Sequence, residues 1–394
     1  MNVYVVGAGV SKTVGYPLGG DLLHEVEELI RLSGSSLRLP EFTAVGPVLR
    51  AWLEMNSDPI IAESYRSGNL EYVFTALDLS WNLFLLKLNK LARRQGGARR
   101  SPVVTTDKDL RAYEMATQQH QRIRQTLLWA LDEYLRRRHK EDGLTFPTST
   151  WADLRRFAAM LGEGDVVITF NYDSTLERVL FQQGKWSPSD GYGFKVDLWH
   201  SMSDRTPVPI AQSKVSTLHL HGSVGWYYKL ALPGGMVIAD ARLSSSEKLE
   251  TLHKTLEESI ALDPLFLMEL GINAIDSWLP DPPPQDRMIV LHPSFLKSFG
   301  PEGQKTIFIN LWRKAADALR AADRIFVIGY SLPEADSAAM ALLLTNCDRE
   351  KVEIVNMDIE TSERLHLLLS SHWVDVRPDD FHDWVNRKPP RSKE

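Results

Sequence analysis

An amide and a carboxylate follow an apolar run near the middle of the chain. Residues 166–170 read Val-Val-Ile-Thr-Phe and are followed by Asn171, Tyr172 and Asp173. Ser174 or Asp173 can cap the next helix, which would make this an ordinary turn. An amide at position 171, however, competes with the hydrogen bonds of the strand and needs partners of its own. Asn171 and Asp173 are therefore candidates for holding a ligand.

Two histidines mark the end of a second apolar run. The segment is His219-Leu220-His221-Gly222, and strand alternation predicts that both imidazoles point to the same face. Gly222 leaves room beside His221, and imidazole is the side chain best suited to exchange protons near neutral pH. His221 is thus a candidate proton acceptor, with a structural hydrogen bond as the alternative. A zinc site would need a third ligand, which the sequence does not position, so we expect no metal.

Small, hydroxyl or amide side chains also follow three other predicted strands. These segments are Gly7-Ala8-Gly9-Val10-Ser11, Gly329-Tyr330-Ser331 and Asn356-Met357-Asp358. Glycines let a backbone approach a phosphate, although a tight turn without a ligand has the same composition. The dehydrogenase fingerprint is incomplete, because Lys12 stands where its third glycine belongs. Together the five strand ends predict a polar groove suited to a nucleotide.

The periodicity of apolar residues predicts the elements that carry these segments. Strands are expected over 3–6, 166–170, 218–221, 288–292, 324–328, 353–357 and 373–376. Helices are expected over 20–32, 151–161, 174–183, 306–322, 335–345 and 361–371. Short apolar strands separated by amphipathic helices indicate an α/β fold with a Rossmann-like parallel sheet covered on both faces. Ligands of such sheets bind beyond the carboxyl ends of the strands.

Two long segments interrupt this alternation. Residues 35–145 are helical in pattern and predict a large helical insertion or subdomain within a single α/β domain spanning 1–394. Residues 231–286 are poor in strands, contain a helical stretch around 246–270, and predict a second excursion or cap. The tail after Lys388 is expected to be disordered.

Composition excludes several classes of protein. A formal net charge of −6 gives no overall basic field for binding nucleic acid directly. Two local basic runs, 93–100 and 136–140, are read as solvated, with a phosphate-bearing partner as the alternative. The single cysteine, Cys347, suits a reducing cytoplasm. No signal peptide and no apolar run long enough to cross a membrane is visible, so we expect a cytoplasmic protein without a membrane partner.

The ordered set of segments resembles the silent-information-regulator (sirtuin) family of NAD-consuming proteins. Gly7 to Ser11 is similar to the family's opening turn, and Gly15-Tyr16-Pro17 to the loop that follows. Asn171-Tyr172-Asp173 is similar to its Asn-x-Asp, and His221-Gly222 to its catalytic histidine and glycine. Gly329-Tyr330-Ser331 resembles its Gly-x-Ser turn, and Asn356 its ribose-contacting asparagine. The cofactor-binding residues expected on this basis are Gly7, Ala8, Gly9, Ser11, Pro17, Asp173, Gly329, Ser331, Asn356 and Asp358.

The chain departs from the protein-deacylating sirtuins in three respects. It cannot form their four-cysteine zinc module, it has Leu18-Gly19-Gly20 in place of their Asp-Phe-Arg, and it carries the insertion at 35–145. The insertion contains Asn69-Leu70-Glu71, which resembles the sirtuin-like effectors of bacterial antiphage defence. In that branch the reaction is hydrolysis of NAD, which depletes the infected cell in abortive infection.

The resemblance implies specific roles and partners. Asn171 would position a water molecule and the nicotinamide-side ribose, His221 would contact a ribose hydroxyl and accept a proton, and Asp173 would orient the ligand or the loop. NAD would be the substrate and no metal would be needed. A homo-oligomer and a regulatory partner such as a hexameric ATPase are expected, because unregulated NAD loss would kill the host. A non-catalytic subunit that senses NAD or another nucleotide, and less plausibly a deacylase, remain as alternatives.

Overall fold

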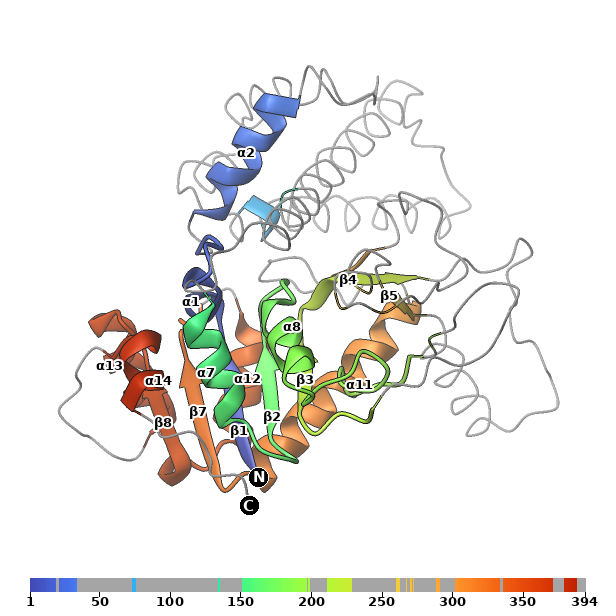
Figure 1. Ribbon diagram of the computed structural model, residues 1–394. Coiled ribbons are helices and arrows are strands. Elements are labelled where there is room, and N and C mark those ends of the chain that lie inside the picture. Colours follow the sequence, from blue (N-terminus) through green and yellow to red (C-terminus); the bar gives the residue numbers. More distant parts are fainter. Residues whose placement is uncertain are drawn as a thin grey trace, which may run out of the picture.

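A five-stranded parallel sheet forms the centre of the protein in the computed structural model (Figure 1). The structure describes residues 1–18, 21–33, 73–75, 134, 151–196, 198, 211–228, 260–262, 267, 270, 272, 288–290, 302–333, 336–370 and 379–387. The strands are β1 (Asn2–Val6), β2 (Val166–Thr169), β3 (Ser216–His219), β7 (Arg324–Ile328) and β8 (Val352–Val355). Their order across the sheet is β3-β2-β1-β7-β8, and every neighbouring pair is parallel. This is the α/β, Rossmann-like arrangement that the sequence predicts.

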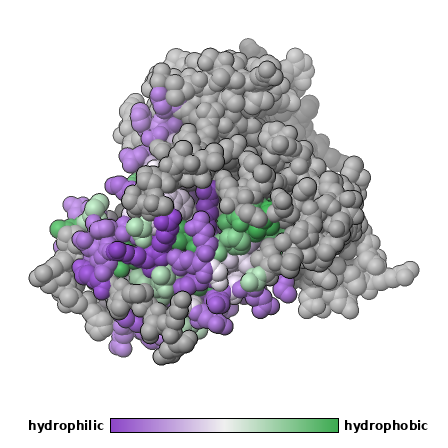
Figure 2. Space-filling view, viewed as in Figure 1, coloured by the Kyte–Doolittle hydropathy of each residue, from purple (hydrophilic) through white to green (hydrophobic). Residues whose placement is uncertain are grey.

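Helices cover both faces of this sheet because its strands are apolar on both sides. On one face lie α7 (Ala152–Met160), α8 (Thr175–Gln182) and α14 (Phe381–Arg387), and on the other lie α11 (Glu302–Ala321) and α12 (Ser337–Asn346) (Figure 1). Tyr4 of β1 defines the first face: it stacks on Phe326 of β7 at 4.9 Å, and its ring meets the edge of Phe157 of α7 at 5.5 Å. The helix α13 (Ile359–Leu369) packs against β8. Hydrophilic residues gather over the region of α7, α13 and α14 that faces solvent (Figure 2).

The strand order places a topological switch point at β1. The chain builds outward from β1 through β2 to β3, and then returns to the other side of β1 to add β7 and β8. The loops that leave the carboxyl ends of β1 and β7 therefore run in opposite directions and leave a crevice between them. Apart from the strand predicted at 288–292 and the helical stretch predicted around 246–270, the predicted strands and helices within the described ranges agree with the observed ones to within a few residues.

The predicted strand at 288–292 does not join the parallel sheet. Instead β6 (Met288–Val290) pairs antiparallel with β4 (Gly222–Tyr228), which also pairs with β5 (Ile260–Leu262). The sequence analysis did not predict β4, and it placed 260–262 in a helical stretch. Such short apolar runs do not distinguish a strand from a buried helix, nor do they reveal the sheet to which a strand belongs.

Several predictions fall mainly outside the described residues. These are the helical insertion at 35–145, the excursion at 231–286 as a whole, the strand at 373–376 and the tail after Lys388. Within these segments the structure describes a helical fragment at 73–75 and the strand β5. The first long helix, α2 (Leu22–Ser33), lies close to its predicted place, whereas α14 was not predicted. None of the helices in the described part of the chain combines the length and apolarity needed to span a membrane.

Candidate functional site

A cavity of about 660 Å³ opens at the carboxyl ends of the parallel strands. Its walls come from the segments that follow β1, β2, β3, β7 and β8, so it occupies the crevice that the strand order creates. Eleven residues singled out from the sequence line it: Ala8, Gly9, Ser11, Pro17, Asn171, Asp173, His221, Gly329, Ser331, Asn356 and Asp358. Gly7 does not line the cavity and lies just beneath its wall.

The glycines after β1 and β7 allow the two turns to pack against each other. A Cβ atom on Gly7 would lie 2.5 Å from Cα of Tyr330, and one on Gly9 would lie 2.8 Å from Cα of Gly329. Gly329 itself has φ +57°, and its carbonyl oxygen accepts a hydrogen bond from the Gly9 amide at 2.9 Å. Backbone packing is therefore sufficient reason for these glycines, and their composition alone is not evidence for a phosphate.

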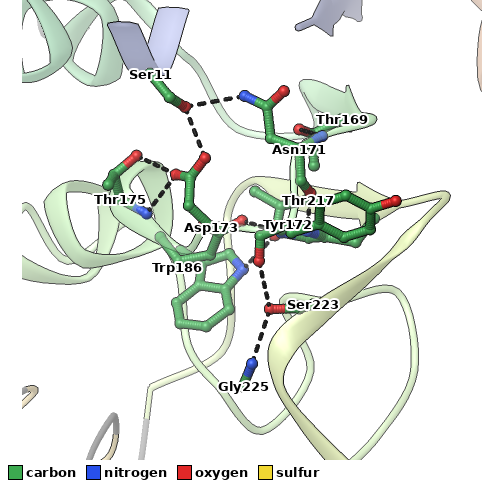
Figure 3. Close-up of polar contacts among 12 residues, drawn as sticks. Ser11, Thr169, Asn171, Tyr172, Asp173, Thr175, Trp186, Thr217, Ser223 and Gly225 are labelled. Atoms are coloured by element: carbon green, nitrogen blue, oxygen red, sulfur yellow. Dashed lines mark hydrogen bonds and ion pairs between the residues drawn. The ribbon is translucent and has the colours of Figure 1, made fainter. Parts of the chain in front are cut away.

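Asn171 is held in place by four hydrogen bonds, of which Figure 3 shows the one to Ser11. Its side-chain nitrogen donates to the Gly7 carbonyl at 3.1 Å and to Ser11 Oγ at 2.9 Å. Its backbone amide donates to Thr169 Oγ1, and its carbonyl accepts from His219 Nδ1 at 3.1 Å. Because both amide hydrogens are used within the protein, Oδ1 is the atom that this side chain can offer to a water molecule or a hydroxyl group.

Asp173 is a buried link between the loops after β1 and β2. Ser11 Oγ donates to its Oδ2 at 2.8 Å, and the backbone and hydroxyl groups of Thr175 donate to its Oδ1 at 3.1 and 2.5 Å (Figure 3). Because Ser11 accepts from Asn171 and donates to Asp173, the three side chains form one chain of hydrogen bonds. Both carboxylate oxygens of Asp173 therefore accept hydrogen bonds from within the protein.

His221 contacts the buried carboxylate of Asp336. The distance from His221 Nε2 to Asp336 Oδ2 is 3.0 Å, and both side chains are almost fully buried. Asp336 also accepts from the Tyr330 hydroxyl at 3.0 Å and caps α12 by accepting from the Ala339 amide at 3.2 Å. Nε2 of His221 is thus directed at a buried carboxylate, which fixes the orientation of the ring. This is the orientation of an imidazole by a carboxylate that general-base sites use.

Aromatic rings surround the imidazole on the cavity wall. Phe170 stacks on Tyr330 with ring centroids 4.4 Å apart and an interplanar angle of 7°. The His221 ring meets the Phe170 ring edge to face at 5.1 Å, and Tyr172 lies 6.2 Å away. These rings give the β2–β3 side of the cavity an apolar wall beside two polar groups, which is the usual composition of a small-molecule site.

His219 and His221 do not share a face, contrary to the prediction. His219 is register-aligned with Thr169 at the last position of β3, and Leu220 and His221 form a turn before β4. Gly222 allows that turn with φ +81°, and Trp312 of α11 fixes it by donating to the Leu220 carbonyl at 3.1 Å. Strand β3 therefore ends at His219, and the alternation of side chains does not extend to His221. The ring of His219 turns towards α8, whereas His221 turns towards α12.

The β8 side of the cavity is acidic. Asn356 Oδ1 accepts from the Asp358 amide at 3.0 Å, and Asp358 caps α13. Hydrogen bonds from Thr361 lower the pKa of Asp358, which keeps this carboxylate ionised at the rim. Asp379 and Asp380 line the same side. Carboxylates here can accept hydrogen bonds from the hydroxyl groups of a ribose.

Several contributors to the cavity were not identified from the sequence, among them Asp336 and three aromatic residues. Asp336 was placed at the start of a helix, but nothing in its local pattern linked it to His221, more than a hundred residues away. Phe170, Tyr172 and Tyr330 were read as strand or turn residues. The sequence did contain one signal for Asp336, which is that an aspartate at the start of a helix can cap it. A capping carboxylate that follows a strand of a parallel sheet lies at the edge where ligands bind, so this signal predicts a residue of the site.

In the described part of the chain, metal binding would need a cluster of ligating side chains, and thiol chemistry would need a reactive cysteine. No group of three or more histidine, cysteine, aspartate or glutamate side chains there is arranged to hold a metal ion. Burial raises the pKa of Cys347 to about 12, so its thiol stays protonated near neutral pH.

Comparison with known proteins assigns no family. No protein-family model matches the chain. No curated protein matches it at a significant level.

Proposed function

We propose that the protein hydrolyses NAD+ at the bond between nicotinamide and ribose, within a sirtuin-type version of the α/β fold. The products would be nicotinamide and ADP-ribose. The proposal includes the biological role that the resemblance implies, namely a regulated effector that depletes NAD during antiphage defence. It combines the resemblance of the short segments with the geometry of the cavity.

The single observation that carries the proposal is the convergence of Asn171 and His221. The two residues lie beyond neighbouring strands, β2 and β3, and both line one cavity that reaches the loop after β1. Asn171 presents an oxygen that can hold a water molecule, and His221 presents an imidazole oriented by Asp336. A site that only bound a nucleotide would have no evident need for an oriented imidazole.

The cavity has room for a dinucleotide laid across the sheet. In this arrangement the diphosphate lies near Gly9 and Lys12, which supplies a positive charge. The nicotinamide-side ribose lies between Asn171 and His221, and the adenosine ribose lies near Asn356 and Asp358. This placement follows the rule that dinucleotides cross a switch point with one half on each side.

The reaction needs few groups because nicotinamide leaves as a neutral molecule from a cationic substrate. As the bond from C1′ to the ring nitrogen breaks, positive charge develops on the ribose. A water molecule held by Asn171 then bonds to C1′, and His221 accepts the proton that this water loses. The protein's contribution is positioning and electrostatic stabilisation, which can supply several kcal/mol of barrier lowering, on the order of 2–4 kcal/mol for one principal group.

Purified protein incubated with NAD+ should release nicotinamide and ADP-ribose in equal amounts, as measured by chromatography. The His221→Ala and Asn171→Ala variants should remain folded and release little. A second outcome is that the protein binds ADP-ribose and releases no nicotinamide from NAD+, both alone and together with the proteins encoded by its genomic neighbours. That result would favour a non-catalytic sensing subunit. Release that depends on an acetylated peptide would favour a deacylase.

Regulation by assembly is the remaining part of the proposal. We expect a homo-oligomer and a partner such as a hexameric ATPase to hold the enzyme inactive until infection. Loss of NAD in infected cells that express the chain with its genomic neighbours, compared with cells expressing His221→Ala, tests this role directly.

A further inference from the structure

His219, at the end of β3, does not line the cavity but contacts a residue that does. We propose that His219, paired with Glu177, is a positioning residue that fixes the peptide of Asn171 from beneath the site. The inference rests on the proposed function, because the consequence of misplacing Asn171 is stated for NAD cleavage.

Both nitrogens of the His219 ring contact acceptor oxygens. Nδ1 lies 3.1 Å from the carbonyl oxygen of Asn171, and Nε2 lies 2.7 Å from Oε1 of Glu177. A backbone carbonyl can only accept a hydrogen bond, so Nδ1 must carry a proton. The ring therefore links the helix α8, through Glu177, to the residue at the tip of β2.

The pair is isolated from solvent. The side chains of His219 and Glu177 are 1% and 2% exposed. Burial by itself lowers the pKa of His219, but the charge and hydrogen bond of Glu177 outweigh it, so the pKa is raised above its usual value. The charge of Asp173 and the Asn171 carbonyl act in the same direction.

The ring itself has no freedom to turn away. Tyr192 and Trp226 meet it edge to face, with ring centroids at 5.6 and 5.5 Å. Glu177 lies in α8, which begins two residues after Asp173, so its position is tied to the same loop. The contact to Asn171 is therefore made by a rigid group.

This contact completes the support of Asn171. The side-chain amide is held by the loop after β1, and the backbone amide is held by Thr169 of β2. From β3, His219 holds the same residue through its carbonyl group. Without it the peptide after Asn171 can rotate, which moves Oδ1 relative to His221. A displacement of about 1 Å at a positioning group can reduce turnover by up to about 100-fold.

A matched pair of variants separates positioning from simple core packing. Both carry Glu177→Gln, which removes the buried negative charge. One adds His219→Asn, whose Nδ2 can take the place of the ring Nδ1 and donate to the Asn171 carbonyl. The other adds His219→Leu, which is similar in bulk to asparagine but cannot donate. Circular dichroism and thermal denaturation establish that both are folded.

We expect the leucine double variant to lose at least about 10-fold in kcat with KM for NAD+ changed by less than about 3-fold, and the asparagine double variant to recover most of that loss. Equal kcat in the two folded variants overturns the positioning role. A change confined to KM overturns it as well.

A ligand-independent measurement distinguishes failure of this inference from failure of the proposed function. Nitrogen NMR of labelled histidine, assigned with His219→Asn, should show a protonated Nδ1 at neutral pH in the wild-type protein. An unprotonated Nδ1 overturns the contact even if NAD+ is cleaved. Wild-type protein that shows the protonated nitrogen but neither cleaves NAD+ nor binds ADP-ribose overturns the proposed function, and with it the catalytic consequence of the contact.

Discussion

His219 and His221 are two residues apart in sequence, yet each pairs with a carboxylate in a different region of the molecule. His219 and Glu177 lie beneath the sheet edge, on the α8 face, among Tyr192 and Trp226. His221 and Asp336 lie on the α12 side and line the cavity. The first pair belongs to the floor of the site and the second to its wall.

The difference shows that access, rather than residue type, separates a structural histidine from a candidate catalytic one. Each imidazole has a buried carboxylate partner at 2.7 or 3.0 Å, so the two pairs are alike in local chemistry. The turn at Leu220 and His221 sends them in opposite directions. Changes to the floor should therefore act first on stability, and changes to the wall on turnover.

The largest expected effect is a fall in the free energy of unfolding when the His219–Glu177 pair is broken. Glu177→Ala leaves the buried His219 without its partner, and breaking a buried ion pair in this way typically costs about 3–5 kcal/mol. Urea denaturation followed by circular dichroism measures the loss. Glu350→Ala, at an exposed site in the 3₁₀ helix Arg349–Lys351, is the control and should change little. A Glu177→Ala protein as stable as wild type would contradict the pairing.

At the wall, His221→Ala and Asn171→Ala should each raise the barrier to NAD cleavage by about 2–4 kcal/mol, a loss of roughly 30- to 1000-fold in kcat/KM. Both proteins should remain folded, because each change removes a side chain at the cavity rather than in the core. Nicotinamide release measures the rate. The matched control is His366→Ala, on α13 and outside the cavity lining, which should keep wild-type turnover. Wild-type rates in either cavity variant would remove the assignment.

Asp336→Asn should sharpen the distinction between orientation and capping. Asparagine can still accept from the Ala339 amide and cap α12, so the unfolding free energy should fall by less than it does in Glu177→Ala. The negative charge facing His221 is lost, and we expect kcat to fall by about 10-fold or more, because an orienting carboxylate holds the catalytic tautomer. Unchanged turnover with unchanged stability would show that His221 does not depend on Asp336.

The pH dependence of stability should report on the floor pair. Because the pKa of His219 is raised in the folded protein, its stabilisation is complete below the unfolded value of about 6.5 and is lost as the pH rises through the folded value. The difference in unfolding free energy between wild type and Glu177→Gln should therefore shrink as the pH is raised above neutrality. Urea denaturation at a series of pH values tests this, and a difference that is constant with pH would contradict it.

The smallest effect is expected at a third histidine–carboxylate pair on the surface. His382 lies 2.9 Å from Asp153, but its side chain is 62% exposed. The hydrogen bond and charge of Asp153 raise the pKa of His382, yet solvent screens the pair. His382→Gln should leave the urea midpoint unchanged within error. A measurable fall in the urea midpoint would show that the contribution of the three pairs to stability does not decrease with their exposure to solvent.

Most of the central sheet could be predicted because its strands are short, continuous apolar runs. Strand β7 has the predicted bounds, and β1, β2 and β8 differ by one or two residues. The polar residues after these strands were found by the same reasoning, since the carboxyl ends of parallel strands meet at one edge. That rule predicts that Asn171, His221, Gly329 and Asn356 lie at one groove, and all four line the cavity.

The errors share a physical cause. β6 was assigned to the parallel sheet because its composition resembles that of the parallel strands, but its partner β4 begins in a turn set by Gly222. The reasoning for His219 and His221 assumed an extended strand through both residues, whereas the strand ends at the first. Periodicity reports burial along one element and does not report where the chain leaves that element.

The sequence by itself determined which strands could be buried on both faces and which polar groups would stand at their ends, because those properties depend on residues a few positions apart. Only the tertiary structure decided that Asp336 meets His221, that Glu177 and His219 support Asn171, and that glycines after β1 and β7 serve packing between turns. These contacts join residues from tens to hundreds of positions apart, and they form only when the sheet order and the helices on its two faces bring those residues together.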